Sequence, residues 1–324
     1  MRFSLTSRQR VLLVRNDNVG DLVCSIPAIR LARERLRGVE IRLLVNSYNV
    51  GVAEPLVPRW VDRLVVYTKT KHAGFGFRQA ARLAGFYRQL LARPCDAAFL
   101  LVGGESRQAL AFARWARARR VFGYGSKAHG PSWEEGRHEV EYSWRVMAYA
   151  LGVEAPPPSE IDYPMRAKGD RVAIQITSRK PGNRWPAARF AEVARAMASA
   201  ARSSVLLFWS PGDQATPTHP GDDRKAEEIV RLAGGAVTPS PTSTLQELIA
   251  RLTECRLMVT PDGGAMHLAA AMGVRVVALF GQSDPTRWRP WTSRAQCLKS
   301  SSATIEDLSE DAVLAAITPY LGSK

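Results

Sequence analysis

The sequence predicts an α/β protein of two domains, each a parallel β-sheet flanked by helices. Short apolar runs alternate with amphipathic stretches along the 324 residues, which is the pattern of parallel sheets with crossover helices. The pattern stops in a proline-rich stretch over residues 154–164 and then restarts. We therefore expect an N-terminal domain over 1–155 and a C-terminal domain over 165–324, with a last helix over 305–321 that could pack back on the first domain.

Strands are expected where aliphatic and β-branched residues cluster, and helices where apolar residues recur on one face. In the first domain we expect strands over 11–15, 40–45, 63–67, 97–102 and 120–124, and helices over 21–37, 77–93, 106–117 and 138–151. In the second we expect strands over 171–176, 204–209, 257–260 and 274–280, and helices over 186–201, 222–232, 244–252, 267–272 and 305–321. Two such domains would place a ligand cleft between them, lined by loops at the carboxyl ends of the strands.

The charge balance predicts an acidic partner. The formal net charge is +15, whereas 46% hydrophobic residues indicate sizeable cores. The partner could be nucleic acid, an anionic membrane face or a phosphorylated substrate, and a basic but otherwise ordinary enzyme is the alternative. No helix-turn-helix, zinc finger or RNA-binding motif favours nucleic acid. Basic residues crowd the first half, which indicates an acidic acceptor or lipid head groups there, or simply a solvated face; they are Arg59, Arg63, Lys69, Lys71, Arg78, Arg82 and Arg88.

The cysteines and the termini indicate a cytoplasmic protein. The four cysteines are widely separated and form no CxxC pair, so a zinc site is not expected, and buried thiols suit a reducing compartment. No N-terminal signal sequence and no run of roughly 18 apolar residues is present. We expect a cytoplasmic protein with peripheral contact to the inner face of a membrane.

The segment over residues 259–288 contains the most informative pattern, a strand, a glycine turn, a helix and a second strand. A glycine turn at a helix start exposes backbone N–H groups, which together with the helix dipole bind phosphate or diphosphate. Asp262 is either a simple N-cap or an N-cap that also orders this turn. His267, in the first turns of the helix, is either structural or a hydrogen-bond donor to a diphosphate.

A second loop, Thr177 to Trp185, follows the first strand of the second domain. Its two hydroxyls, three cations and one glycine form a composition suited to phosphate oxygens, and a solvated basic loop is the alternative. Trp185 and Pro186 are expected to pack the start of the next helix.

A third loop, Arg15 to Leu22, joins the first strand to the first helix. Asp21 is expected in the first helical turn, either as an N-cap or as a general base directed into the cleft. Asp17 competes for the role of base. Gly20 allows close backbone approach and so favours a ligand-facing loop.

A fourth loop, over residues 208–223, is rich in proline and glycine and contains three acids, Asp213, Asp222 and Asp223. An acid after a strand can bind ribose hydroxyls in nucleotide sites. The sequence does not decide which of the three does so, and a solvated loop is the alternative.

These motifs together resemble glycosyltransferase family 9, the lipopolysaccharide heptosyltransferases of Gram-negative bacteria. The resemblance runs through most of the chain and rests on Val11–Arg15, Val19–Asp21, Ile26–Ala28, Asn183–Glu192, Asp262–Gly273 and Leu279–Trp288. It implies a GT-B architecture, in which two Rossmann-like domains face each other across a cleft. It also implies inverting transfer of heptose from an ADP-linked donor to a lipopolysaccharide core acceptor, without an obligatory metal or other cofactor.

The resemblance assigns roles to particular residues. Asp21 matches the family's candidate catalytic base. The implied donor-binding residues are Thr177, Ser178, Lys180, Arg184, Asp213, Asp262, Gly263, Gly264, Ala265, Met266 and His267, and the implied acceptor-binding residues are Asn18, Gly20, Arg59, Lys69 and Lys71.

Two positions depart from the family pattern. The family commonly has Lys at the position of Asn183, so that Lys180 or Arg184 would have to bind the donor phosphates instead. The loop over 211–223 is also longer than expected. Two alternatives remain, namely a GT-B-fold sugar-nucleotide epimerase and a non-catalytic protein that binds anions or a membrane surface.

Overall fold

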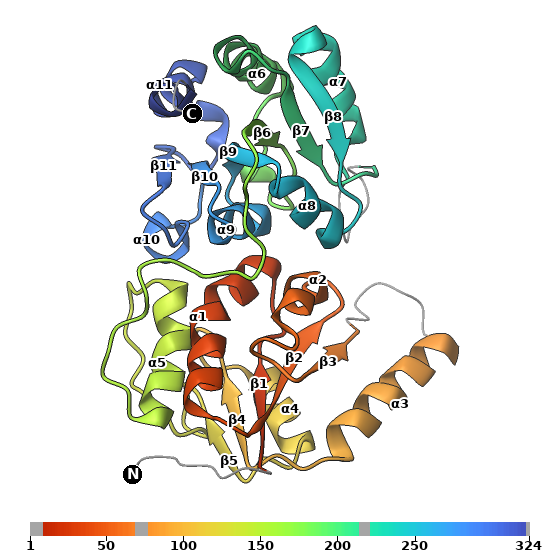
Figure 1. Ribbon diagram of the computed structural model, residues 1–324, viewed down its shortest axis with the longest axis vertical. Helices are drawn as coiled ribbons and strands as arrows, with labels where there is room; N and C mark the ends of the chain where they lie inside the picture. Colours follow the sequence, from red (N-terminus) through yellow and green to blue (C-terminus); the bar gives the residue numbers. More distant parts are fainter. Residues whose placement is uncertain (1–8, 69–76, 214–220, 322–324) are drawn as a thin grey trace. The chain divides into compact units, whose positions relative to one another are not determined.

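The computed structural model describes residues 9–68, 77–213 and 221–321. It divides into two compact units, Met1–Pro164 and Met165–Lys324 (Figure 1). Among the described residues, no helix is both long and apolar enough to cross a membrane.

The first unit contains a parallel five-stranded sheet in the order β3-β2-β1-β4-β5. Its strands are β1 (Arg10–Val14), β2 (Glu40–Asn46), β3 (Arg63–Tyr67), β4 (Ala97–Leu100) and β5 (Arg120–Phe122). Its helices are α1 (Val19–Arg35), α2 (Val50–Ala53), α3 (Phe77–Leu91), α4 (Arg107–Trp115) and α5 (Glu139–Leu151). Helices α1 and α5 pack together on one face of the sheet, and α3 and α4 pack on the other. The central strand is therefore buried on both faces, which explains its continuous apolar run Val11–Val14.

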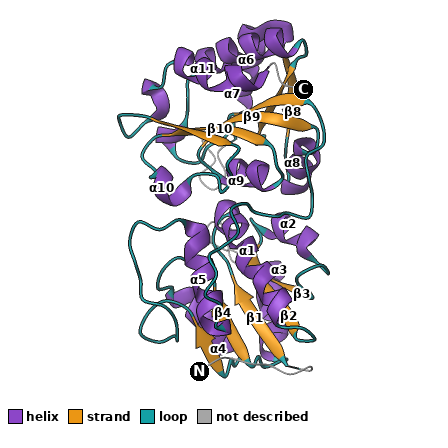
Figure 2. Ribbon diagram, turned by 60° about the vertical axis from the view of Figure 1, so that its left-hand side comes forward, coloured by secondary structure: helices purple, strands orange, loops and turns teal. Residues whose placement is uncertain are grey.

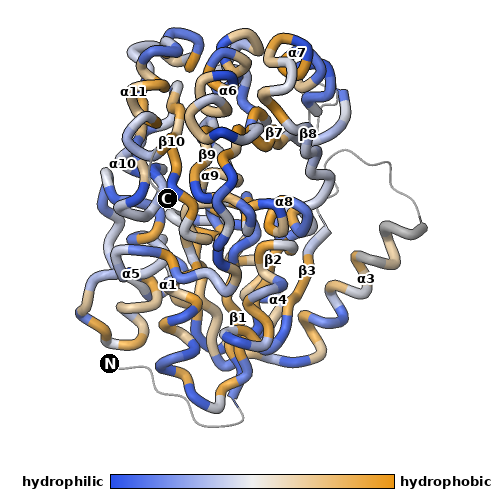
Figure 3. The backbone as a smooth tube through the Cα atoms, turned by 45° about the horizontal axis from the view of Figure 1, so that its top comes forward, coloured by the Kyte–Doolittle hydropathy of each residue, from blue (hydrophilic) through white to orange (hydrophobic). Residues whose placement is uncertain are grey.

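The second unit contains a parallel six-stranded sheet in the order β11-β10-β9-β6-β7-β8. Its strands are β6 (Arg171–Gln175), β7 (Val205–Trp209), β8 (Val237–Pro241), β9 (Cys255–Pro261), β10 (Arg275–Phe280) and β11 (Ala295–Lys299). Its helices are α6 (Ala187–Ala201), α7 (Asp223–Ala233), α8 (Leu245–Leu252), α9 (Gly264–Ala271), α10 (Pro285–Trp288) and α11 (Glu310–Leu321). Figure 2 shows α6, α7 and α11 on one face of this sheet and α8 and α9 on the other, and Figure 3 shows the hydrophobic residues of β9 and β10 between them.

The strand order of both sheets places the loops of interest. In each sheet the order reverses beside the first strand, between β1 and β4 in the first unit and between β6 and β9 in the second. Ligands of doubly wound sheets bind outside the carboxyl ends of the strands at such a reversal. The loops after β1, β6 and β9, three of the four singled out in the sequence, begin at these points.

Several elements differ from the sequence expectation. Strands β8 and β11 were not predicted because neither shows a buried apolar run: β8 contains two prolines, and β11 is only partly buried. Helix α1 begins two residues earlier than expected because Asn18 is its N-cap. The last helix begins only at Glu310, where Ser309 Oγ accepts a hydrogen bond from the N–H of Ala312. It packs on α6, and its packing on the first domain stays a prediction.

Lys225 gives the second unit a pH-dependent stability. Burial lowers the pKa of this amine on α7 to about 8, Arg184 adds to the shift, and Asp222 opposes it. Because the pKa is higher in the unfolded chain, the unfolded state binds more protons between about pH 8 and 10.5, and stability rises with pH in that window.

We expect Lys225→Met to raise the melting temperature by a few degrees at pH 7 and to lose this advantage by about pH 10.5. Thermal melts across this range test the prediction, with the exposed Lys168→Met as the matched control. A gain that is the same at both pH values would contradict it.

Candidate functional site

The loop after β1 is held by amide side chains at the end of β2. Asn46 Nδ2 donates to the carbonyl oxygens of Asn16 and Asp17, both at 2.6 Å, and Asn49 Nδ2 donates to the carbonyl of Arg15 at 3.3 Å. Both asparagines are fully buried, so these bonds are made away from water. The loop is therefore fixed in position at the carboxyl edge of the first sheet.

Asp21 lies in the first turn of α1, three residues after the N-cap. Asn18 donates to Asp21 Oδ2 from its backbone nitrogen at 3.1 Å and from Nδ2 at 2.9 Å, which gives a capping box. Arg15 Nη2 lies 3.3 Å from Asp21 Oδ1. These three contacts leave one of roughly four acceptor positions of a carboxylate open. The side chain is 11% exposed, so the carboxylate is not completely shielded from solvent.

Arg15 is a fully buried cation that connects four elements around Asp21. Its Nε donates to the carbonyl of Asp21 at 3.0 Å, and its Nη1 donates to the carbonyl of Leu101 after β4. Its Nη2 donates to Glu139 Oε1 at 2.6 Å, and Asp17 lies 3.4 Å away. Burial alone lowers the pKa of Arg15, but Asp21, Glu139 and Asp17 outweigh it and raise the pKa above its ordinary value. Arg15 is therefore charged at neutral pH.

Glu139 is the closest counterion of Arg15, and its role was not predicted from the sequence. It is the first residue of α5 and is only 1% exposed. Its carboxylate lies against Gly103, where a Cβ atom would stand 2.6 Å from Glu139 Oε2. Gly103 thus makes room for the carboxylate. A first-turn glutamate is ordinary in a helix, so only the three-dimensional contact with Arg15 identifies it.

The turn after β9 leads directly into α9. Gly263, and not Asp262, is the N-cap of this helix, and its backbone is extended. Asp262 precedes the cap and accepts from Asn183 Nδ2 at 3.4 Å through Oδ2 and at 3.3 Å through its carbonyl. Asn183, at the family's lysine position, is buried and so connects the loop after β6 to this turn. The N–H groups of Gly264, Ala265 and Met266 have no acceptor within the helix, which is the basis of an anion site.

Two lysines converge on the loop after β10. Lys180 Nζ donates to Ser283 Oγ at 3.0 Å, and Lys299 Nζ donates to the carbonyl of Gly281. Both side chains are exposed. The sequence reasoning missed Lys299 because β11, at whose carboxyl end it lies, was not predicted.

Asp222 and Asp223, at the end of the acidic loop after β7, contact other described residues. Asp223 accepts from Trp209 Nε1 at 2.7 Å and from the N–H of Gly212 at 2.9 Å. Asp222 is buried and pairs with Arg184 Nη1 at 3.1 Å, while burial raises its pKa. Arg184 is thereby committed to Asp222, whereas Asp213 is exposed, and the choice of a ribose-binding acid among the three stays a prediction.

The remaining predicted donor residues lie beside these loops. Thr177 Oγ1 accepts from the N–H of Ser210 at 2.8 Å, and the carbonyl of buried Ser178 accepts from Arg184 Nε at 2.9 Å. His267 is buried, with its ring 6.3 Å from that of Trp288. Trp185 is fully buried against Phe190, so the expectation that it packs the helix start is confirmed. No cluster of three His, Cys, Asp or Glu able to hold a metal occurs among the described residues.

The predicted acceptor residues are only partly brought together. Asn18 and Gly20 lie in the Asp21 loop. Arg59 stacks on the ring of Trp60, shortly before β3. Nearby, the N–H of Asp62 donates to the carbonyl of Ile41, at the amino end of β2. The structure therefore places Arg59 at the opposite edge of the sheet from Asp21. Lys69 and Lys71 lie outside the described residues.

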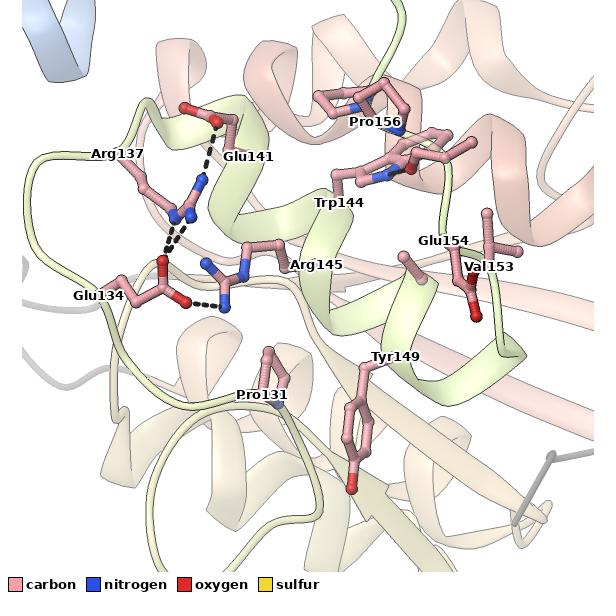
Figure 4. A pocket seen from close by; sticks show the side chains of 13 residues that line it. Pro131, Glu134, Arg137, Glu141, Trp144, Arg145, Tyr149, Val153, Glu154 and Pro156 are labelled. Carbon is pink, nitrogen blue, oxygen red and sulfur yellow. Dashed lines mark hydrogen bonds and ion pairs between the residues drawn. The ribbon is translucent and has the colours of Figure 1, made fainter.

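A further pocket lies on the outer surface of α5, away from these loops (Figure 4). It has a volume of about 350 Å³ and is lined by Glu134, Arg137, Trp144, Arg145 and Tyr149, among others. Hydrogen bonds from Arg145 and Arg137 lower the pKa of Glu134 to about 2. Glu134, Arg137, Glu141 and Arg145 thus pair with one another, and the pocket contains none of the predicted site residues.

Comparisons with known proteins identify the family and the fold of this chain. The model of glycosyltransferase family 9 (heptosyltransferase) matches residues 116–316. Lipopolysaccharide heptosyltransferase 1 of Salmonella typhimurium is 25% identical over 85% of this chain and 89% of its own. Two solved structures share the fold, E. coli heptosyltransferase WaaC with ADP and the same enzyme with ADP-2-deoxy-2-fluoro heptose. Their TM-scores are 0.79 and 0.76 at 20% and 19% identity, each over 96% of this chain and 99% of the other.

Two Rossmann-like units with loops at their topological reversals share the GT-B fold of these structures, and the family model makes the protein a glycosyltransferase. The family model covers more than half of the chain. The protein therefore belongs to glycosyltransferase family 9, the heptosyltransferases.

Proposed function

We propose that this protein transfers heptose from ADP-heptose to the core of a lipopolysaccharide acceptor, with inversion at the anomeric carbon. Membership of the heptosyltransferase family favours this function over the epimerase and the non-catalytic alternatives. One similar structure was solved with ADP and another with a fluorinated ADP-heptose, which supports ADP-heptose as the donor. We further propose that it acts in the cytoplasm, at the inner membrane where such an acceptor is anchored.

Asp21 acts as the general base in this proposal. Its free acceptor position takes the proton of an acceptor hydroxyl, whose oxygen attacks the anomeric carbon of the donor. The bond from that carbon to the diphosphate breaks as the new one forms, and ADP leaves with the electron pair. The observation that carries the proposal is the carboxylate of Asp21, oriented by Arg15 and Asn18 at the carboxyl edge of β1.

The second unit stabilises the departing diphosphate. The N–H groups at the start of α9 offer fixed dipoles, and Lys180 and Lys299 offer positive charge beside the loop after β10. Preformed donors and cations of this kind stabilise charge that develops in the transition state. In this chain the two lysines take the place of the family's lysine at position 183.

Nucleotide binding tests the donor assignment. We expect calorimetry at moderate salt to show binding of ADP, but not of UDP, GDP or CMP. Lys180→Met and Lys299→Met are each expected to weaken ADP binding about tenfold, the loss of one charge-assisted contact. Lys168→Met, an exposed lysine distant from these loops in the sequence, serves as the matched control. Preference for another nucleotide would discard the ADP-linked donor, and unchanged binding in both variants would discard the lysine roles.

A further inference from the structure

The positive charge of this protein is concentrated in one part of its first unit. Between residues 63 and 133 there are thirteen Lys and Arg but only two acids, Asp96 and Glu105, a net charge of +11 out of +15 for the whole chain. The rest of the chain is thus close to neutral. A uniformly basic protein would not show this asymmetry, which indicates a localised surface for an anionic partner.

Helices α3 and α4 form the centre of this surface. They pack side by side through Phe86 and Phe112, with ring centroids 5.6 Å apart, and neither contains an acidic residue. Arg88, Arg107 and Arg114 on these helices are exposed and form no ion pair with any described residue. A solvated helix face normally mixes both signs of charge in i,i+4 pairs, so the absence of acids here is unusual.

Exposed apolar side chains lie among the arginines at the ends of the two helices. Leu91, the last residue of α3, is 43% exposed, and Trp115, the last residue of α4, is 39% exposed. The Trp115 ring contacts that of Tyr87 at 4.8 Å, and Arg117 Nη2 donates to the carbonyl of Leu91 at 2.9 Å. Arg88 lies one helical turn before Leu91, and Arg107 and Arg114, seven residues apart, share one face of α4, so the apolar and basic groups lie close together.

We propose that this surface, formed by Arg88, Leu91, Arg107, Arg114, Trp115 and Arg117, docks on an anionic phospholipid bilayer. Arginines beside an exposed leucine and tryptophan match a membrane interface, where phosphates lie next to the acyl boundary and indole rings prefer the head-group level. The arginines could also bind the phosphates of a nucleic acid, but a nucleic acid would offer exposed Leu91 no apolar contact. The inference concerns lipid binding alone and does not depend on the proposed transfer reaction.

Sedimentation with vesicles tests the proposal. We expect the full chain to bind phosphatidylglycerol vesicles and not phosphatidylcholine vesicles at 0.1 M salt. A basic residue close to an anionic surface contributes about fivefold to partitioning. Arg88→Gln, Arg107→Gln and Arg114→Gln together should therefore weaken binding by at least about tenfold. The matched control removes equal charge from exposed arginines of the second unit, with Arg224→Gln, Arg231→Gln and Arg294→Gln, and should change binding less than about twofold.

A second variant separates insertion of the apolar side chains into the bilayer from electrostatic attraction to its surface. Leu91→Ser with Trp115→Ser should remove the residual binding that persists at 0.5 M salt, where charge is screened. Thermal melting establishes that each variant is folded. Equal losses from both arginine triples, no dependence on anionic lipid, or salt-resistant binding unaffected by the serine variant would each overturn the proposal. Tighter binding to duplex DNA than to vesicles through the same arginines would overturn it in favour of nucleic acid.

Discussion

Asp21→Asn is expected to lower kcat for heptose transfer by about 10³-fold while leaving ADP affinity unchanged. The amide keeps the shape of the side chain and can still contact Arg15 and Asn18, but it cannot take a proton, and a positioned general base supplies about 10² to 10⁴ in rate. The residues proposed to bind ADP belong to the second unit, so the loss should appear in kcat alone. The measurement is ADP release with and without acceptor, alongside calorimetric binding of ADP.

The matched control is Asp17→Asn in the same loop. The Asp17 carboxylate also lies near Arg15, at 3.4 Å, but its side chain is 35% exposed. We expect this variant to retain most of the wild-type kcat. A variant of Asp21 with near wild-type turnover would remove it as the base, and a larger loss at Asp17 than at Asp21 would transfer the role to Asp17.

Arg15→Met is expected to destabilise the first unit by about 3–5 kcal/mol. The change removes the buried cation and leaves the Glu139 carboxylate, only 1% exposed, without its counterion. Replacing both partners, with Arg15→Met and Glu139→Gln together, should recover much of that loss, because the most deeply buried of the uncompensated carboxylates is then gone. Urea unfolding followed by fluorescence and by circular dichroism measures both free energies of unfolding.

The exposed pair Arg30 and Glu34 on α1 is the control for this comparison. Its side chains are 45% and 52% exposed, and the ion pair spans 2.7 Å. Arg30→Met should therefore cost less than about 1 kcal/mol. If Arg15→Met costs no more than Arg30→Met, the buried network is not an important source of stability.

The sequence predicted most elements of both sheets because central parallel strands are buried on both faces. Strands such as β1 and β10 appear as continuous apolar runs, and their helices are amphipathic or rich in small residues. Strands β8 and β11 lack that signal, since β8 contains two prolines and β11 is only partly buried. Helix ends were less well predicted, because they depend on caps such as Asn18 that are recognised only by their hydrogen bonds.

The candidate site was predictable where a loop follows a predicted strand. The loops after β1, β6 and β9 were found in this way, and the structure places them at the reversals of strand order. The partners of their residues were not predictable. Glu139 reaches Arg15 from 124 residues away in the chain, and the pairing of Arg184 with Asp222 removes a cation that composition alone would assign to phosphate.

The close contact between Gly103 and Glu139 constrains how sequences of this type can diverge. A side chain at position 103 would displace the carboxylate that neutralises Arg15, so positions 15, 103 and 139 are expected to change together. A relative with a small residue at 139 has room for a larger one at 103, but then needs another way to neutralise a cation at position 15. In libraries of this protein, single replacements at any of the three should be depleted, and compensating combinations should be recovered.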